Sequence, residues 1–176
     1  MDSDVRRIVE RLTQEGNKTR DFFRDLSAVD LDQVVYTEGA AWKVKDLLAH
    51  LAATEATMLG LLKNVLAGGA GIPEDFDLDS FNEAQVSQRS DLSPQDLLDR
   101  FLTDRQALVQ VVVKLRESDL ARRGRHPWLG WTTVGEVLQL VYRHSMLHLR
   151  DARRALVSRQ PVPPTGARPR AAPRLE

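Results

Sequence analysis

The chain has 176 residues, 42% hydrophobic and 28% charged, which is enough for one globular domain with its own core. Its 25 basic and 25 acidic residues give zero formal net charge, which argues against nucleic acid or an acidic membrane surface as the main partner. The sequence contains no cysteine, so disulfides, a cysteine nucleophile and thiolate metal ligands are excluded.

Neither a membrane span nor a leader is visible in the sequence. There is no run of about 18 apolar residues and no charged segment followed by an apolar one at the start. We therefore expect a cytoplasmic protein that does not interact with membranes.

Two long amphipathic patterns occupy the first third of the chain. The first runs over about residues 4–26 and the second over about 43–66, each with apolar residues at helical spacing. Gly68 and Gly69 end the second pattern. Both segments are predicted to be helices.

The next segment is a long connection followed by a strong helix start. Residues 68–91 are expected to hold a short helix over about 79–88. Ser93 can then cap the third long helix, with Pro94 at its first position and Asp96 near its positive end.

The fourth long helix is predicted to begin at Thr133, because Glu136 three residues later completes a capping box. It continues to about Leu156. The connection before it contains Trp128 and Trp131, which we expect to plug one end of the helical assembly. No segment of the chain has a convincing strand pattern.

Four helices of this length predict an all-α fold, an antiparallel four-helix bundle over residues 3–157. The length of the connection between the second and third helices allows a crossover. Residues 158–176 are rich in proline and arginine and are predicted to form a disordered tail. An exposed face of the bundle could pair two copies into a homodimer.

Three of the four histidines fall in the predicted helices. His144 and His148 are four residues apart and so share a helix face, and His50 on another helix could supply a third nitrogen. Three imidazoles with an open position are typical of a catalytic metal site. The alternative is that they are core histidines bonded to carboxylates such as Glu55 or Asp151. The residues alone leave these two interpretations open.

Neutral imidazoles suit Zn²⁺, Ni²⁺ or Fe²⁺, of which zinc and nickel are the ions we expect. The open position could hold water or a thiol, and an ion lowers the pKa of either one. Because the chain has no cysteine, any thiol would come from outside.

Several motifs together resemble a known family. Residues 42–51 (WKVKDLLAHL) and 142–151 (YRHSMLHLRD) resemble the signatures of the second and last helices of the DinB-like superfamily. Phe81 and Asn82, followed by Arg89, resemble a segment of its thiol-transferase branch. The superfamily includes YfiT-like proteins and the metal-binding domain of mycothiol-dependent maleylpyruvate isomerase. Lys43 departs from the family, which often has a small capping residue after the tryptophan.

The resemblance covers about residues 3–157. It implies a four-helix bundle with a divalent ion held by His50, His144 and His148. Members with known activity are similar in using a low-molecular-weight thiol, such as mycothiol or bacillithiol, for transfer or isomerisation. Others resemble hydrolases or self-protection proteins.

Four functions remain open, three of them with a small molecule as partner. The first is a metal-dependent thiol transferase, in which Asn82 and Arg89 could contact the thiol or the second substrate. The alternative for Asn82 is a helix cap, and the alternative for Arg89 is a solvated charge. The second is a hydrolase with Glu55 or Asp151 as base. The third is a non-enzymatic protein that sequesters a small molecule, and the fourth is an interaction domain with structural histidines.

Overall fold

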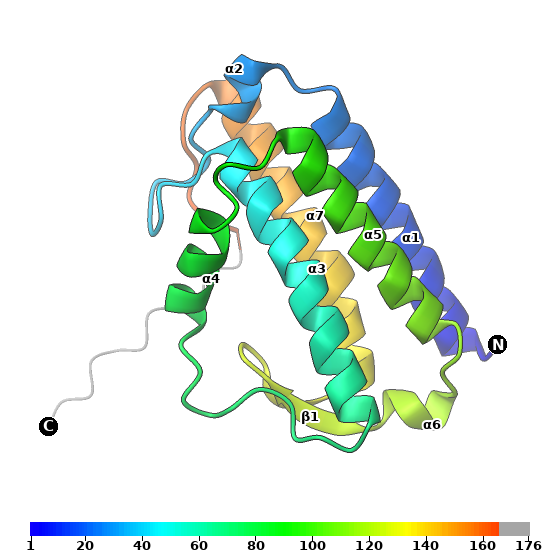
Figure 1. The fold of residues 1–176 in the computed structure, drawn as a ribbon. Helices are drawn as coiled ribbons and strands as arrows, with labels where there is room; N and C mark the ends of the chain where they lie inside the picture. Colours follow the sequence, from blue (N-terminus) through cyan, green and yellow to red (C-terminus); the bar gives the residue numbers. More distant parts are fainter. Residues whose placement is uncertain (166–176) are drawn as a thin grey trace, which may run out of the picture.

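The computed structural model describes residues 1–165 of the chain, and four long helices form its body (Figure 1). They are α1 (Ser3–Arg24), α3 (Val44–Leu66), α5 (Pro94–Val112) and α7 (Val134–Ser158). Helices α1, α3 and α7 lie within two residues of their predicted bounds, and α5 begins at Pro94 as predicted. The predicted all-α bundle is confirmed. None of the helices in the described part combines the length and apolar composition of a membrane span.

The predicted helix starts at α5 and α7 are confirmed by reciprocal caps. The Ser93 hydroxyl accepts the Asp96 N–H at 3.0 Å, and the Thr133 hydroxyl accepts the Glu136 N–H at 3.2 Å. At α3 the Asp46 carboxylate accepts the Lys43 N–H at 2.9 Å. Helix α3 therefore begins where the family pattern predicts, although lysine replaces a small capping residue.

Some neighbouring helices of the bundle run parallel to each other and others run antiparallel. Helices α3 and α5 descend side by side in Figure 1, and α1 and α7 run the opposite way. The two core clusters agree with this arrangement. One combines the starts of α3 and α5 with the ends of α1 and α7: Phe23, Leu47, Leu51, Leu97, Phe101 and Ala152. The other combines the opposite ends: Val5, Leu12, Met58, Leu62, Leu108 and Val137. The crossover that the long connection allowed is therefore present between α3 and α5.

Short elements join the long ones. Helix α2 (Ala28–Leu31) follows α1, and α6 (Glu117–Leu120) follows α5. The crossover contains α4 (Leu78–Ser87), which packs against the outer side of α3 (Figure 1). The predicted short helix is therefore present within one residue of its expected bounds.

The expectation that the chain has no strand is wrong. Strands β1 (Arg123–His126) and β2 (Gly130–Thr133) form an antiparallel hairpin below the bundle. Each has only four residues and no run of alternating apolar side chains, so it gives no strand pattern. Gly71 packs on β1 with a positive φ of 89°, where an added Cβ would lie 2.4 Å from the Arg125 carbonyl oxygen.

The two loop tryptophans do not plug the bundle. Trp131 is 52% exposed, and its ring lies under the Arg125 guanidinium at 5.6 Å. Trp128 is 37% exposed and lines a cavity on the side of the bundle. Trp131 is therefore a surface residue and Trp128 borders the cavity, which the sequence pattern did not predict.

The predicted disordered tail is wrong for residues 158–165, and residues 166–176 lie outside the described part. Val162 is 7% exposed and pairs with the segment after α2. Its N–H donates to the Val35 carbonyl at 2.8 Å, and its own carbonyl accepts the Thr37 N–H at 3.1 Å. This pairing orders the segment after α7, although its composition is typical of a linker.

A buried ion pair connects all four long helices. Arg105 on α5 binds Glu55 on α3 through two bonds, from Nε at 2.7 Å and from Nη2 at 2.5 Å. The same guanidinium donates to the Leu12 carbonyl on α1 at 2.9 Å and to the Ser145 hydroxyl on α7 at 3.2 Å. Gly16 gives it room, because a Cβ there would lie 3.1 Å from Arg105 Cγ.

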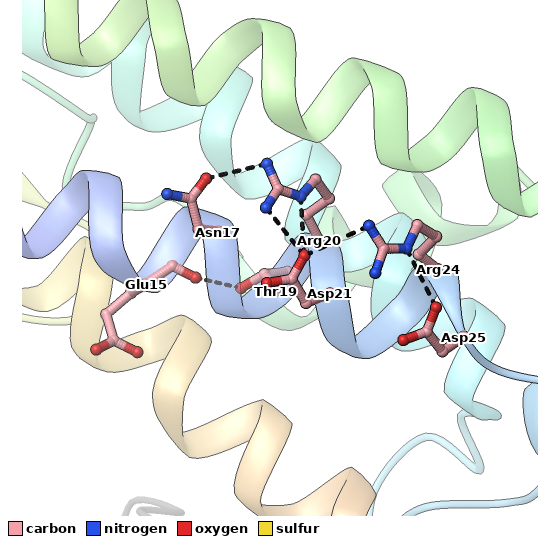
Figure 2. A network of polar contacts seen from close by, with 7 residues as sticks. All are labelled: Glu15, Asn17, Thr19, Arg20, Asp21, Arg24 and Asp25. Atoms are coloured by element: carbon pink, nitrogen blue, oxygen red, sulfur yellow. Dashed lines mark hydrogen bonds and ion pairs between the residues drawn. The ribbon is translucent and has the colours of Figure 1, made fainter.

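The outer side of α1 carries ion pairs that are exposed to solvent, in contrast to the buried pair of Arg105 and Glu55. Figure 2 shows Arg20 bonded to Asn17 and Asp21, and Arg24 bonded to Asp21 and Asp25. Exposed pairs of this kind add little to stability, because water and salt screen them. Their charged side chains make this face of α1 polar, whereas the buried pair connects the four helices inside the bundle.

Replacing Arg105 by methionine should strongly destabilise the protein. Glu55 would keep a buried carboxylate without its partner, which costs about 3–5 kcal/mol. Arg100→Met on the exposed face of α5 is the matched control, with an expected change within about 0.5 kcal/mol. Urea unfolding measures both, and equal stability of the two variants would contradict the structural role of the pair.

Val162→Ala should lower the free energy of unfolding by about 1–2.5 kcal/mol, because it removes buried methyl groups. Val157→Ala changes the same side chain at a position that is 87% exposed, and should have little effect. Urea unfolding of both proteins measures the difference. A Val162→Ala protein as stable as the Val157→Ala protein would show that the segment after α7 does not pack.

Candidate metal centre

The structure brings together the three histidines that the sequence singled out. The Nε2 atoms of His50 and His144 are 3.1 Å apart, and those of His144 and His148 are 2.9 Å apart. One nitrogen from each ring lies within 4.8 Å of the other two. His50 comes from α3 and the other two from α7, which run antiparallel side by side (Figure 1).

The geometry and chemistry of the three rings fit a metal ion. Four nitrogens arranged tetrahedrally at 2.0–2.1 Å from an ion are about 3.3 Å apart, close to the observed separations. A neutral imidazole has one N–H, so three Nε2 atoms directed at one another leave lone pairs without donors. Among the described residues, His50 Nδ1 also has no hydrogen-bond partner. The expected bonds from these histidines to Glu55 or Asp151 are not what holds them.

Burial keeps the three rings neutral. It lowers the pKa of His50, His144 and His148 well below the ordinary value of 6.5, and positive charge on a neighbouring histidine lowers it further. Only neutral imidazole offers a lone pair to a metal. The site therefore has the protonation state that ligation needs at neutral pH.

Tyr36 orients the third histidine. Its Oη lies 2.6 Å from His148 Nδ1. Burial, and secondarily the charge of Asp151, raises the pKa of Tyr36 well above its ordinary value, so the phenol stays protonated. When His148 presents the lone pair of Nε2, its Nδ1–H donates to this oxygen, as outer partners of metal-binding histidines do. Sequence reasoning missed Tyr36, because it lies in a loop far from both histidine motifs.

A cavity of about 200 Å³ lies beside the histidines. Helices α3, α4 and α7 and the β hairpin contribute to its wall. Most of the wall is apolar, with the large side chains Trp42, Met58, Phe76, Phe81, Trp128 and Val141. Polar groups also line it: Thr54, Thr57, Asp79, Asn82 and His126. The arrangement can hold a small molecule against the histidine cluster.

Of the two proposed thiol contacts, the structure places only one at the cavity. Asn82 on α4 lines the cavity and also a second pocket of about 320 Å³ beside it. Arg89 lies beyond the end of α4 and binds Gln85, through its carbonyl at 3.0 Å and its side chain at 2.7 Å. The guanidinium of Arg89 therefore has a local structural partner instead of a place in the site.

The two carboxylates expected as candidate bases are engaged elsewhere. Glu55 is buried against Arg105, and burial raises the pKa of Glu55 while Arg105 opposes the rise. Asp151 is buried and accepts both the N–H and the hydroxyl of Thr165. Neither lines the cavity, so the assignment of either as a base is wrong. Asp79 is the carboxylate among the described residues that does line it.

His126, the fourth histidine, was missed as a site residue because it has no partner at helical spacing. It ends β1 and lines the cavity. Its Nδ1 accepts the N–H of Trp128 at 3.0 Å and of Leu129 at 3.2 Å. Nδ1 therefore carries no proton, and the neutral ring carries its proton on Nε2.

Comparison with known proteins agrees with this picture. The family model of the DinB superfamily matches residues 11–152. The sequence matches none of the curated proteins with which it was compared. Among solved structures, the chain is similar to YfiT from Bacillus subtilis, described as a probable metal-dependent hydrolase with an unusual four-helix bundle topology. The TM-score is 0.73 at 18% identity, over 90% of this chain and 89% of that one.

Two further structures share the fold. The mycothiol-dependent maleylpyruvate isomerase has a TM-score of 0.68 at 15% identity, over 86% of this chain and 63% of that longer chain. The colibactin self-resistance protein ClbS, solved in complex with a dsDNA, has a TM-score of 0.63 at 15% identity, over 85% of this chain and 95% of that one. At these identities the likeness establishes the fold alone, and the activity has to be argued from the residues of the site.

Stability of the metal-free protein should fall as the pH falls below about 6.5. The histidines of the unfolded chain take up protons there, whereas the three buried rings do not, since their pKa is lowered. Each such histidine contributes a slope of up to about 1.4 kcal/mol per pH unit. Urea unfolding between pH 7.5 and 5.5, with a chelator present, measures the total slope.

His144→Gln is the matched control for this pH effect. Glutamine does not titrate, so the variant should lose one proton's share of the slope between pH 7.5 and 5.5. The absolute stability of the variant does not enter, because only the slope is compared. Equal slopes for the two proteins would show that His144 titrates normally in the folded state.

Proposed function

The chain belongs to the DinB superfamily, and on this basis we propose that it is a metal-dependent enzyme that transfers an external low-molecular-weight thiol to an electrophilic small molecule. The observation that carries the proposal is the convergence of His50, His144 and His148 at one side of a largely apolar cavity. Three neutral imidazoles at this spacing suit a divalent ion, zinc or nickel. Bound there, such an ion lowers the pKa of a thiol or water and supplies a nucleophile at neutral pH.

The residues of the chain then have distinct tasks. The histidines hold the ion, and Tyr36 fixes the ring of His148 through Nδ1. The apolar walls exclude water from the reacting groups. Asn82 on α4 lies where the cavity meets the neighbouring pocket, and can bind polar groups of the thiol. A thiol of the mycothiol or bacillithiol type has polar groups of this kind, and it supplies the sulfur that this cysteine-free chain lacks.

Hydrolysis is the second candidate, and Asp79 is the observation that favours it. An exposed carboxylate at the cavity could act as a base toward water. The transfer reaction is preferred because the buried carboxylates Glu55 and Asp151 are held by other partners, which leaves hydrolysis with Asp79 as its candidate base. Sequestration of a small molecule without turnover is the third outcome.

His144→Ala should remove the metal and the activity together, because the variant keeps only two of the three imidazoles. Metal analysis should give about one divalent ion per chain for the unchanged protein and less than about a tenth of that for the variant. Met146→Ala, at an exposed position on the same helix, is the control and should keep its metal. Circular dichroism checks that both variants remain helical, since metal binding also contributes to folding.

Thiol consumption then separates the candidate activities. Metal-loaded protein is incubated with a panel of electrophiles, with and without mycothiol, bacillithiol or glutathione. The proposal predicts loss of the electrophile only when a thiol is present. Turnover without thiol would make the protein a hydrolase, and binding without turnover would make it a sequestering protein. Absence of metal from the unchanged protein after purification with added zinc or nickel would overturn the metal site.

A further inference from the structure

The cavity is elongated along the groove between α3 and α7. On α3 its wall runs from His50 to Met58, which is about 12 Å at 1.5 Å per residue. On the antiparallel α7 it runs from His148 back to Leu140. The histidine cluster therefore lies at one end. Met58 and the β hairpin lie at the other, which is called the far end below.

Aromatic rings from separate parts of the chain enclose this groove. Trp42 precedes α3, and its ring lies 4.8 Å from that of His50. Phe76 precedes α4 and lies 5.0 Å from Phe81 within it. Trp128 is in the turn of the hairpin. Aromatic walls bind flat apolar molecules by burial of area and by ring contacts.

In the part of the chain that the structure describes, the far end has no lysine or arginine side chain that could neutralise an anion. Among the described residues that line the cavity, none is lysine or arginine. At His126, which also lines the cavity, Nδ1 accepts two backbone N–H groups and so offers no proton to an anion. The one charged side chain of the wall, Asp79, is itself negative. A carboxylate at the far end would lose hydration and find neutral polar side chains such as that of Thr57 in place of a cation.

We infer that the ligand of this cavity is an uncharged aromatic molecule of about one or two rings, with its reactive group at the histidines and an uncharged far end. In this inference, the assignment of the histidine end as the reactive end rests on the proposed function. The size, the aromatic walls and the charge of the far end stand without it. An acidic group at the reactive end is compatible with the cavity, because a divalent ion there would attract it.

Calorimetric binding of two matched compounds tests the inference: 2-acetylnaphthalene and 6-acetyl-2-naphthoate. They differ only by a carboxylate at the end opposite the carbonyl group. The full chain is used as purified and again after chelation of metal. After chelation the neutral compound should bind at least tenfold more tightly than the carboxylate, because the far end has no lysine or arginine to pair with the carboxylate. With a metal ion bound the preference should be smaller, because the ion can attract the carboxylate in the reversed orientation.

Trp128→Arg places a cation at the far end and should reverse the preference between the two compounds. Trp128 is partly exposed, so its replacement spares the core, and circular dichroism checks the fold. Met146→Ala on the outer surface should behave like the unchanged protein. In the metal-free, otherwise unchanged protein, equal binding of both compounds, a preference for the carboxylate, or no binding of either compound would overturn the inference.

The outcome is independent of the thiol assay. A neutral-over-acidic preference together with no thiol consumption would leave the ligand class standing and reject the transferase. Thiol-dependent turnover together with equal binding of both compounds would support the transferase and reject the ligand class. Equal affinity of the two compounds in the Trp128→Arg protein, after a clear preference in the unchanged one, would show that discrimination arises away from the far end, and the inference would be wrong.

Discussion

The buried ion pair between Arg105 and Glu55 is the constraint on which the rest of the bundle depends. Both side chains are almost fully removed from water, so each requires the other. The guanidinium also bonds Ser145, the residue next to His144 on α7. Glu55 lies a little more than one turn from His50 on α3. The guanidinium of Arg105 therefore links α3 and α7 close to the histidines that each helix carries.

The sequence predicted the parts of this protein that depend on local chemistry. The starts of α5 and α7 follow from Ser93 with Asp96 and from Thr133 with Glu136, since each cap forms within four residues. The pairing of His144 with His148 follows from the helical repeat alone. Adding His50 needed more, because 94 residues separate it from His144. There the family resemblance supplied what spacing could not.

Features made by contacts between distant segments escaped prediction. Val162 looks like part of a linker until it pairs with the loop at Val35. Tyr36 becomes a partner of His148 only because that same loop is held against α7. The hairpin that carries His126 is too short for a strand pattern. The carboxylates Glu55 and Asp151 looked like candidate bases because a sequence does not show which buried partners a charge will find.

The pairing of residue 162 with the loop after α2 has a consequence for biosynthesis. The loop that holds Tyr36 is synthesised more than 120 residues before Val162, whose backbone pairs with it, so the loop cannot be fastened until the later segment is made. Helices α1, α3 and α5 can associate while the chain is still growing, but the histidine cluster cannot close before α7 and the segment beyond it have left the ribosome. Any metal ion held by the three histidines would therefore be captured only after α7 is made, because a chain synthesised only as far as α5 contains His50 alone of the three.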